Sequence, residues 1–534
     1  MARGSQFRNL PRRRLRRTKF DLSHERRLTC DPFYLVPILV DDCIPGDTWQ
    51  ISNELIIRVN PLLTPIMHEI NAFIHYYFVP YRLLWSDWEE FITGGRDGRF
   101  TSPLPLYTHP SSTGQGSLWD YLGFNIFDPN TQSVSKTPIA FPHRSYNLIY
   151  NEYYRDQNLQ EEIDLDWENI STNSLHIRSW EKDYFTSMLP WQQRGEAPAF
   201  PIQGVLNASF PSPEVDSSVG IVPSFANFNP LAPDGRLNMR GVSFSGMSIN
   251  SGTPSISAND DLSRNAGQQL YQYLSRGTVD MQQAVSFGVS EMRFGFQVQL
   301  FLERMARGGS RYTEFLRNIF GAYPRDDRLN RPEYIGGSKS PVVISEVLQT
   351  SSTDSTSPQA NMAGHGITAD RTFIANYRVQ EHGLIMGIMS IMPRSMYQQG
   401  IDRVWLRENR FDFYFPEFAH LSEQAIYPEE IYNYAGPPNA VLGYGGRYDE
   451  YRWKRNSVHG LFRNDLDFWH MGRKFSTHPQ LNLDLVRPST TEIQQLKRVL
   501  AVPTEHMFLV SIGNKCHVTR PLPYMAVPGL IDHS

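Results

Sequence analysis

The sequence predicts a mainly β protein, an antiparallel barrel or sandwich that carries long loop and helical insertions. Runs rich in Val, Ile, Phe and Tyr cluster near both ends of the chain, whereas helical patterns and long polar stretches lie between them. The 37 glycines and 37 prolines indicate many turns. Because strands and helices do not alternate, the order of the elements argues against a βαβ fold.

Three strands are expected early in the chain, separated by proline and glycine turn signals. They are FYLVPILV (33–40), WQISNELIIRV (49–59) and INAFIHYYFV (70–79). Both faces of the third run are mostly apolar, which predicts a strand that is buried on both sides. The following segment, 81–95, predicts a short helix that presents Leu84, Trp88 and Phe91 on one face and ends at two glycines.

The middle of the chain is expected to hold loops and helices. Residues 96–145 are rich in Pro, Ser, Thr and Gly, which predicts long loops with local ordering. No helical or strand period persists in the low-charge stretch from Pro201 to Leu262, and a loop of that length is usually functional or disordered. Helical patterns are LSRNAGQQLYQYLSR (262–276), EMRFGFQVQLFLERMARGG (291–309) and RYTEFLRNIFGA (311–322).

Strand patterns return in the last third of the chain, so strands are expected near both of its ends, without an internal repeat. These later patterns are PVVISEVLQ (341–349), DRTFIANYRV (370–379), EHGLIMGIMSIMP (381–393) and MFLVSIGNKCHVTRPLP (507–523). A polar loop is expected between the first two, at 352–366. With 40% hydrophobic residues, the chain has enough apolar surface for a large core.

The strongest local signal is a basic arm at residues 1–20, which contains no acidic residue. Its eight cations are Arg3, Arg8, Arg12, Arg13, Arg14, Arg16, Arg17 and Lys19. Since the chain has a net charge of −4, removing these +8 leaves −12 on residues 21–534. A basic tip on an acidic body favours contact with a polyphosphate such as single-stranded DNA, although a solvated tail or a targeting signal stays open.

Other chemistry is weakly supported. Cys30, Cys43 and Cys516 are odd in number and have no CxxC spacing, so buried free thiols are expected rather than disulfides or zinc ligands. No P-loop, HExxH or GxSxG motif is present, and no cofactor is expected. Asp41 and Asp42 have the chemistry to bind a hard cation, but adjacent acids in a turn are usually only solvated.

Two features of the chain bear on its environment and on base stacking. Neither a signal peptide nor a transmembrane segment is expected, because the longest apolar run, GLIMGIMSIMP, is about half a bilayer span. Trp85, Trp88, Trp180 and Trp191 have rings suited to stacking on bases, but core or interface positions are the commoner use of tryptophan.

Several motifs together resemble the major capsid protein of the Microviridae, in particular its gokushovirus branch. They are FDLSHERRLTC, LVPILVDDCIPGDTW, PLLTPIMHEINAFIHYYFVPYRLLWSDWEEFITGG, WEKDYFTSMLPWQQRG, ARGGSRYTEFLRNIFG, RLNRPEYIGG and KFSTHPQL. These motifs extend from residue 20 to about residue 480, so the resemblance spans nearly the whole chain. The basic arm and the stretch around 201–280 lie outside them.

The resemblance implies an eight-stranded antiparallel jelly roll that self-assembles into a T=1 icosahedral capsid around circular single-stranded DNA. It implies an internal scaffolding protein, a DNA pilot protein and a small basic DNA-binding protein as partners, with assembly in the bacterial cytoplasm and residence in the virion. It also implies a projection at each threefold axis for host attachment, whose contact residues the sequence does not identify. The expected divisions are the arm (1–20), the first part of the shell domain (21–200), the projection (201–280) and the helical insertion with the rest of the shell domain (281–534).

This interpretation makes the chain a structural protein and not an enzyme. Two other classes stay open from the residues alone. A carbohydrate-active β-sandwich enzyme would need a pair of carboxylates in one cleft. A monomeric nucleic-acid-binding module would use the arginine arm without forming particles.

Overall fold

The computed structural model describes residues 17–107, 114–126, 136–165, 174–196, 198, 289–309, 311–348, 362–434 and 440–525, together with four short strands between residues 208 and 279. Within these residues the strands of both large sheets pair antiparallel, and helices are few and, apart from the 20-residue α5, short. The mainly β fold class is therefore confirmed.

The chain divides into two compact units. The larger contains residues 1–196 and 300–534, and the smaller contains Ala197–Gln299. In the smaller unit short strands pair as β6 with β9 and β7 with β8. Their bounds are Ala208–Ser209 (β6), Val222–Ser224 (β7), Ser243–Ser245 (β8) and Thr278–Val279 (β9). The helix expected at 262–276 lies outside the described residues.

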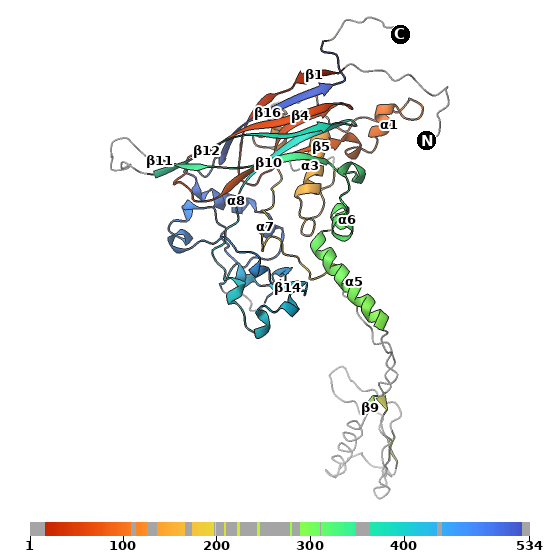
Figure 1. The fold of residues 1–534 in the computed structure, drawn as a ribbon, viewed down its shortest axis with the longest axis vertical. Coiled ribbons are helices and arrows are strands. Elements are labelled where there is room, and N and C mark those ends of the chain that lie inside the picture. The colour runs from red at the N-terminus through yellow and green to blue at the C-terminus, as the bar shows by residue number, and fades with distance from the viewer. Residues whose placement is uncertain are drawn as a thin grey trace, which may run out of the picture. The chain divides into compact units, whose positions relative to one another are not determined.

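The first sheet of the larger unit has six strands in the order β1-β16-β4-β12-β11, with β2 also paired to β16 (Figure 1). Thr18 of β1 lies opposite Arg520, and Cys30 of β2 lies opposite Phe508, so β1 and β2 act as one interrupted strand along β16. The bounds are Thr18–Asp21 (β1), His24–Cys30 (β2), Thr48–Val59 (β4), Ile344–Leu348 (β11), Met362–Arg378 (β12) and Phe508–Arg520 (β16).

The second sheet has four strands in the order β10-β5-β13-β3. Their bounds are Val36–Cys43 (β3), Ile70–Pro80 (β5), Glu333–Pro341 (β10) and Gly383–Pro393 (β13). Every residue of β13 is buried, and so is every residue of β5 except His75. This confirms the prediction that the run at 70–79 is buried on both faces.

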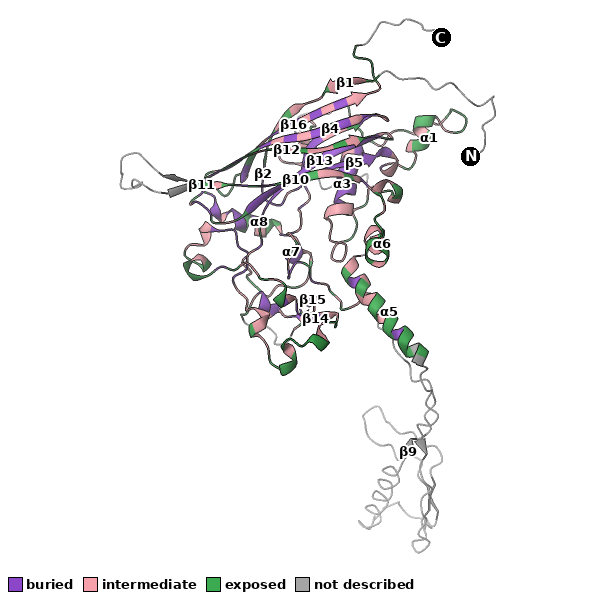
Figure 2. Ribbon diagram, in the orientation of Figure 1, coloured by how far each residue is buried: buried purple, intermediate pink, exposed green. Residues whose placement is uncertain are grey.

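The two sheets enclose the main core. Along β4 the side chains alternate, with Trp49 and Ile51 buried and Gln50 and Arg58 exposed, as the banding of the strands in Figure 2 shows. Asn514 of β16 is a polar bridge between the sheets. Its Nδ2 atom donates to the Ile38 carbonyl at 2.9 Å, and its Oδ1 atom accepts from the Tyr76 hydroxyl at 3.3 Å.

Helices and loops cover the other face of the four-stranded sheet. Helix α3 packs on β13, and its buried Tyr146 donates to the carbonyl of Leu35 at 2.8 Å. Trp180 is buried against Phe33, with ring centroids 4.4 Å apart, which confirms a core position for this tryptophan. The helices are α1 (Trp88–Thr93), α2 (Leu118–Tyr121), α3 (Phe141–Ile149), α5 (Val289–Gly308), α6 (Tyr312–Phe320), α7 (Leu483–Val486) and α8 (Thr490–Leu496).

A second, smaller core lies beside β14 (Glu423–Ile426) and β15 (Gly443–Gly446). Its buried members are Tyr184, Phe185, Met188, Tyr397, Ile426, Ile431, Leu442 and Leu485. Asp183, next to this core, accepts hydrogen bonds from Ser395 at 2.6 Å and from Tyr397 at 2.7 Å. These bonds tie the loop at 181–187 to the segment that follows β13.

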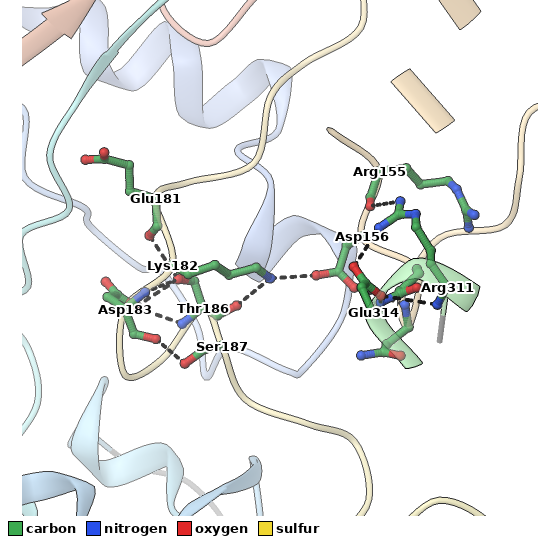
Figure 3. A network of polar contacts seen from close by, with 11 residues as sticks. Arg155, Asp156, Glu181, Lys182, Asp183, Thr186, Ser187, Arg311 and Glu314 are labelled. Carbon is green, nitrogen blue, oxygen red and sulfur yellow. Dashed lines mark hydrogen bonds and ion pairs between the residues drawn. The ribbon is translucent and has the colours of Figure 1, made fainter. Parts of the chain in front are cut away.

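A polar network extends from this loop to α6 (Figure 3). Lys182 Nζ lies 2.7 Å from Asp156 Oδ2 and donates to the Thr186 carbonyl at 3.0 Å. Arg311, at the start of α6, donates to the carbonyl of Arg155 at 3.2 Å and pairs with Glu314 at 3.4 Å. The network therefore fixes the start of α6, which follows α5 in the larger unit.

Several sequence expectations are confirmed and others are corrected. Strands occur at 36–43, 48–59, 70–80, 344–348, 383–393 and 508–520, and helices occur at 289–308 and 312–320, close to the predicted runs. The helix expected at 81–95 is wrong in length, because a 3₁₀ turn at Tyr81–Leu83 precedes the six-residue α1. That helix does end at Gly94, whose φ is 81°.

The loop expected at 352–366 is wrong over its last five residues, since β12 begins at Met362. Small residues made this segment look like a loop. Glycine stands at position 366 for a packing reason and not because of a turn, since a Cβ there would lie 2.5 Å from Cγ2 of Val59. Strands β1, β2 and β10 were not predicted, because alternate charged or glycine residues interrupt their apolar pattern.

Candidate nucleic-acid interface

The outer face of the six-stranded sheet is exposed and rich in cations. Strand alternation sends one set of side chains into the core and the other set away from it. The outward set includes three acidic residues, Asp21, Glu25 and Glu54. Its six cationic residues are Lys19, Arg27, Arg58, Arg371, Arg378 and Lys515. This surface therefore carries net positive charge on a body whose net charge is −12.

The acidic residues of this face lie between cations. Glu54 has Arg371 Nε at 3.4 Å from one carboxylate oxygen and Lys515 Nζ at 3.5 Å from the other. Arg27 pairs with Glu25 at 3.4 Å, with their side chains 82% and 53% exposed. Exposed pairs of this kind are held weakly. The cations are thus free to exchange a carboxylate for a phosphate.

Arg58 differs from Arg27, Arg371 and Lys515, because no described carboxylate lies within ion-pair distance of it. In the register of the sheet it lies opposite Leu509 of β16 and Ile367 of β12, which are themselves 40% and 44% exposed. An unpaired guanidinium beside exposed apolar side chains is suited to a ligand that has both charged and flat apolar parts, as a nucleotide does.

The sheet face is hollowed around this arginine. A groove of about 1100 Å³ is lined by Arg26, Arg27 and Arg58, by Ile56 and Leu509, and by Tyr121 and His506 at its rim, among others. Arg26 donates to the Tyr121 carbonyl at 3.2 Å, and burial lowers the pKa of its guanidinium.

The rim of the groove is fixed by hydrogen bonds. Thr29 Oγ1 and His506 Nδ1 lie 2.8 Å apart, and Asn60 Nδ2 donates to the His506 carbonyl at 2.6 Å. The groove thus combines apolar side chains with cations held in place by the sheet, although Asp120 and Glu505 also line it. Its walls come from β2, β4 and β16, from residues 504–506 before β16, and from the segment around α2.

The basic arm joins the sheet at this face. Thr18 pairs with Arg520, so the chain enters and leaves the sheet at the same corner (Figure 1). Arg17 and Lys19 are exposed there. The remaining six candidates, Arg3, Arg8, Arg12, Arg13, Arg14 and Arg16, lie outside the described residues. The expectation that residues 18–20 belong to a separate flexible arm is wrong, since they form the start of β1.

Other candidate sites do not form. Asp41 and Asp42 lie in β3 and not in a solvated turn: Asp42 accepts from the Tyr81 hydroxyl, and burial raises the pKa of Asp41. The described part of the chain contains no group of three His, Cys, Asp or Glu side chains placed to hold a metal ion. Cys30, Cys43 and Cys516 are buried free thiols, as predicted.

Two further results concern the predicted absence of a membrane span and the cations that the sequence analysis missed. No helix among the described residues is both long and apolar enough to cross a bilayer. The cations of the sheet face were missed in the sequence, although the alternation in HERRLTC, with Glu25, Arg27 and Thr29 on one side, is a signal that was available.

Comparison with known proteins gives one consistent answer. The family model described as capsid protein (F protein) matches residues 8–530. The chain is 33% identical to capsid protein VP1 of Chlamydia phage 1, with 98% of each chain covered. It is also 33% identical to capsid protein VP1 of Bdellovibrio phage phiMH2K, over 91% of this chain and 90% of the relative.

A third relative extends the match to a more distant virus. The chain is 26% identical to capsid protein VP1 of Spiroplasma virus 4, over 96% of this chain and 95% of the relative. The resemblance to the gokushovirus branch of the Microviridae, stated from the sequence motifs, is thereby confirmed. The chain belongs to the capsid protein (F protein) family of phages.

Proposed function

We propose that this chain is the coat subunit of a small phage, that its two sheets form an eight-stranded jelly roll, and that copies of it close into a T=1 icosahedral shell around circular single-stranded DNA. Joining β1 to β2 leaves four long strands in each sheet, with β11 as an extension of the edge. Two stacked antiparallel sheets of four strands are the architecture of a jelly roll.

In this proposal the outer face of the six-stranded sheet lines the inside of the shell. The observation that carries it is the continuity between the basic arm and the cationic sheet face, which meet at Thr18 and Lys19. Arginine grips phosphate through paired N–H donors, and a chain with net negative charge would otherwise repel DNA. The arm and the face together supply the counter-charge for the packaged genome.

The remaining parts of the proposal rest on what the resemblance to this family implies. The subunit acts as a structural protein and not as a catalyst, resides in the virion, and assembles in the host cytoplasm with an internal scaffolding protein, a DNA pilot protein and a small basic DNA-binding protein. The insertion at 201–280 projects at the threefold axis and contacts the host receptor. Its placement in a compact unit of its own, Ala197–Gln299, supports this role.

The test of the proposal is imaging of particles made with a variant arm. Replacing the six arginines at 3, 8, 12, 13, 14 and 16 by serine removes their charge but keeps β1, whereas replacing them by lysine keeps the charge as a matched control. We expect icosahedral particles in all three cases, with less DNA per particle for the serine variant only. Absence of icosahedral order in the wild type refutes the shell, and unchanged DNA content in the serine variant refutes the role of the arm.

A further inference from the structure

A second exposed surface has a different composition from the cationic sheet face. It lies in residues 405–415 and 447–451, which come before β14 and after β15 in the chain, and we call it the aromatic–arginine surface. Its exposed rings are Trp405 (78% exposed), Phe411 (49%), Phe413 (53%), Tyr414 (51%) and Tyr451 (53%). Aromatic residues and arginine are the types enriched at the centres of protein–protein interfaces.

Arginine side chains connect these rings. The Arg407 guanidinium lies over the rings of both Phe413 and Tyr451, 4.7 and 5.3 Å from their centroids, and donates to the Tyr451 hydroxyl. The rings of Tyr414 and Tyr451 are 6.1 Å apart. Phe413, Tyr414 and Tyr451 are therefore joined into one patch by these contacts, and Trp405 and Phe411 are exposed in the same segment, 405–415.

The backbone beneath the rings is held rigidly. Tyr448, which is buried, adopts a φ of 64°, a conformation that is strained for a residue with a side chain. Its hydroxyl donates to the Phe413 carbonyl at 3.1 Å and accepts from the Phe415 N–H at 3.3 Å. Arg447 donates to the Phe411 carbonyl at 3.1 Å. Anchors fixed in advance lose little conformational entropy when a partner binds.

We propose that a second copy of this chain covers the aromatic–arginine surface, which makes the surface a subunit contact of the shell. This inference rests on the proposed shell-forming function. Covering the five rings would remove on the order of 500 Å² of largely apolar surface from water, a large share of the ~800 Å² per partner of a stable interface. The largest exposed apolar patch of a typical monomer covers about 300–600 Å² and is often a functional contact, and this surface lies within that range.

A copy of the chain fits this surface better than a nucleic acid or a host receptor, because the surface lacks the features that those partners would need. The patch has no uncompensated row of cations for a nucleic acid: Glu408, Asp412 and Asp449 accompany its three arginines, Arg407, Arg410 and Arg447. Every copy in a closed shell meets neighbours, whereas a host receptor meets only an outward projection. A rigid, neutral and aromatic surface fits an identical protein neighbour.

The test compares shell yield among variants made with the other genes of the phage. The double variant Trp405→Ser with Phe413→Ser removes two exposed rings, and Trp405→Phe with Phe413→Tyr keeps aromatic surface at the same positions. We expect the fraction of subunit found in shells to fall at least tenfold for the serine variant and to recover with the conservative one. Thermal unfolding of the free subunit checks that both variants fold alike.

Other outcomes overturn the proposal in distinguishable ways. Serine-variant shells formed at the normal yield refute a subunit contact, and if they adsorb poorly to cells, the surface binds a host component instead. If the serine variant does not fold, the comparison uses Arg407→Ser instead, which leaves every ring in place. A normal yield of shells from the Arg407→Ser variant then refutes the proposal. Failure of the wild type itself to form shells refutes the proposed function and this inference together.

Discussion

The ammonium nitrogen of Lys497 lies 3.1 Å from Oδ2 of Asp31, and both side chains are buried in the main core. Asp31 also accepts a hydrogen bond from the backbone N–H of Met507 at 2.9 Å. This pair joins the end of β2 to the segment before β16, residues that are more than 460 positions apart in the chain. It closes the core at the end of the six-stranded sheet.

We expect Lys497→Met to destabilise the subunit by about 3–5 kcal/mol, because it leaves the Asp31 carboxylate buried and unpaired. Thermal or denaturant unfolding of the free subunit measures the loss. The double variant Lys497→Met with Asp31→Asn removes both charges, while the new side-chain amide keeps an oxygen for the Met507 N–H, and it should recover most of the stability. A single variant as stable as the wild type contradicts the assignment.

Acid should weaken the subunit through buried histidines. Burial, with smaller contributions from His143 and Arg487, lowers the pKa of His176 to about 3, and its ring stacks on Tyr150 with centroids 4.2 Å apart. The unfolded chain takes up this proton near pH 6.5, whereas the folded chain does not. Stability is therefore complete above pH 6.5 and falls as the pH decreases from there toward 3.

The measurement is the melting temperature of the free subunit at neutral and at mildly acidic pH. His176→Phe keeps an aromatic ring between its neighbours and removes the titration. At about pH 5 the wild type should have lost on the order of 1–2 kcal/mol through this residue, and the variant should show a correspondingly smaller acid-induced drop. Equal drops in the two proteins would show that His176 does not contribute.

Binding of single-stranded DNA should depend on the cations of the sheet face. Replacing Arg27 and Arg58 by serine removes two groups from the groove, and each lost phosphate contact should reduce the slope of log K against log salt by about 0.7. Fluorescence anisotropy of a labelled oligonucleotide with the free subunit gives the slope. The control is Arg99→Ser, which removes an exposed arginine in the segment after α1. If this variant changes the salt slope equally, the slope depends on the overall charge of the subunit and not on this surface.

The strands that were predicted and those that were missed differ in what surrounds them. The runs that became β4, β5 and β13 have continuous or regular apolar positions because they border the main core. Strand β2 also alternates, but two of its four inward positions are His24 and Arg26, so only Leu28 and Cys30 mark its apolar face. Strand β10 carries Gly336 and Gly337, which resemble a turn in the sequence.

The candidate interface could be predicted only in part for a related reason. The cations of the arm are adjacent in the sequence, so their charge is visible there. The cations of the sheet face come from five strands, and only the register places Arg58 beside Leu509 or Lys515 beside Glu54. Strand pairing between residues hundreds of positions apart is not encoded in any local pattern.

Gly337 of β10 should tolerate no side chain. A Cβ at this position would lie 2.5 Å from the carbonyl oxygen of Ile74 in β5, so backbone atoms of the paired strand would have to move. We expect Gly337→Ala to cost about 1–3 kcal/mol in unfolding experiments. Gly513→Ala in β16, where the nearest atom is 3.6 Å from the new Cβ, is the matched control and should change stability by less than about 1 kcal/mol. Equal effects would mean that packing at Gly337 does not decide the cost.

Removal of the smaller unit should leave the larger one folded. The chain leaves the larger unit near Arg194 and returns near Leu302, and the N–H of Arg194 donates to the Leu302 carbonyl at 3.3 Å. Because these two points are hydrogen-bonded, a short Gly/Ser linker can replace Ala197–Gln299 without pulling on either core. The arginine at position 311 and its network with Glu314 and Arg155 remain to hold the return point.

We expect this excised variant to unfold at nearly the same temperature as the full chain and to retain its yield of shells, while its adsorption to host cells decreases. Calorimetry, negative-stain microscopy and a cell-binding assay measure the three properties. Normal adsorption would contradict a receptor role for the insertion, and loss of shells from a folded variant would show that the smaller unit itself contributes subunit contacts. A matched insertion of the same linker between Arg194 and Gly195, with the unit retained, separates the effect of the linker from the effect of the excision.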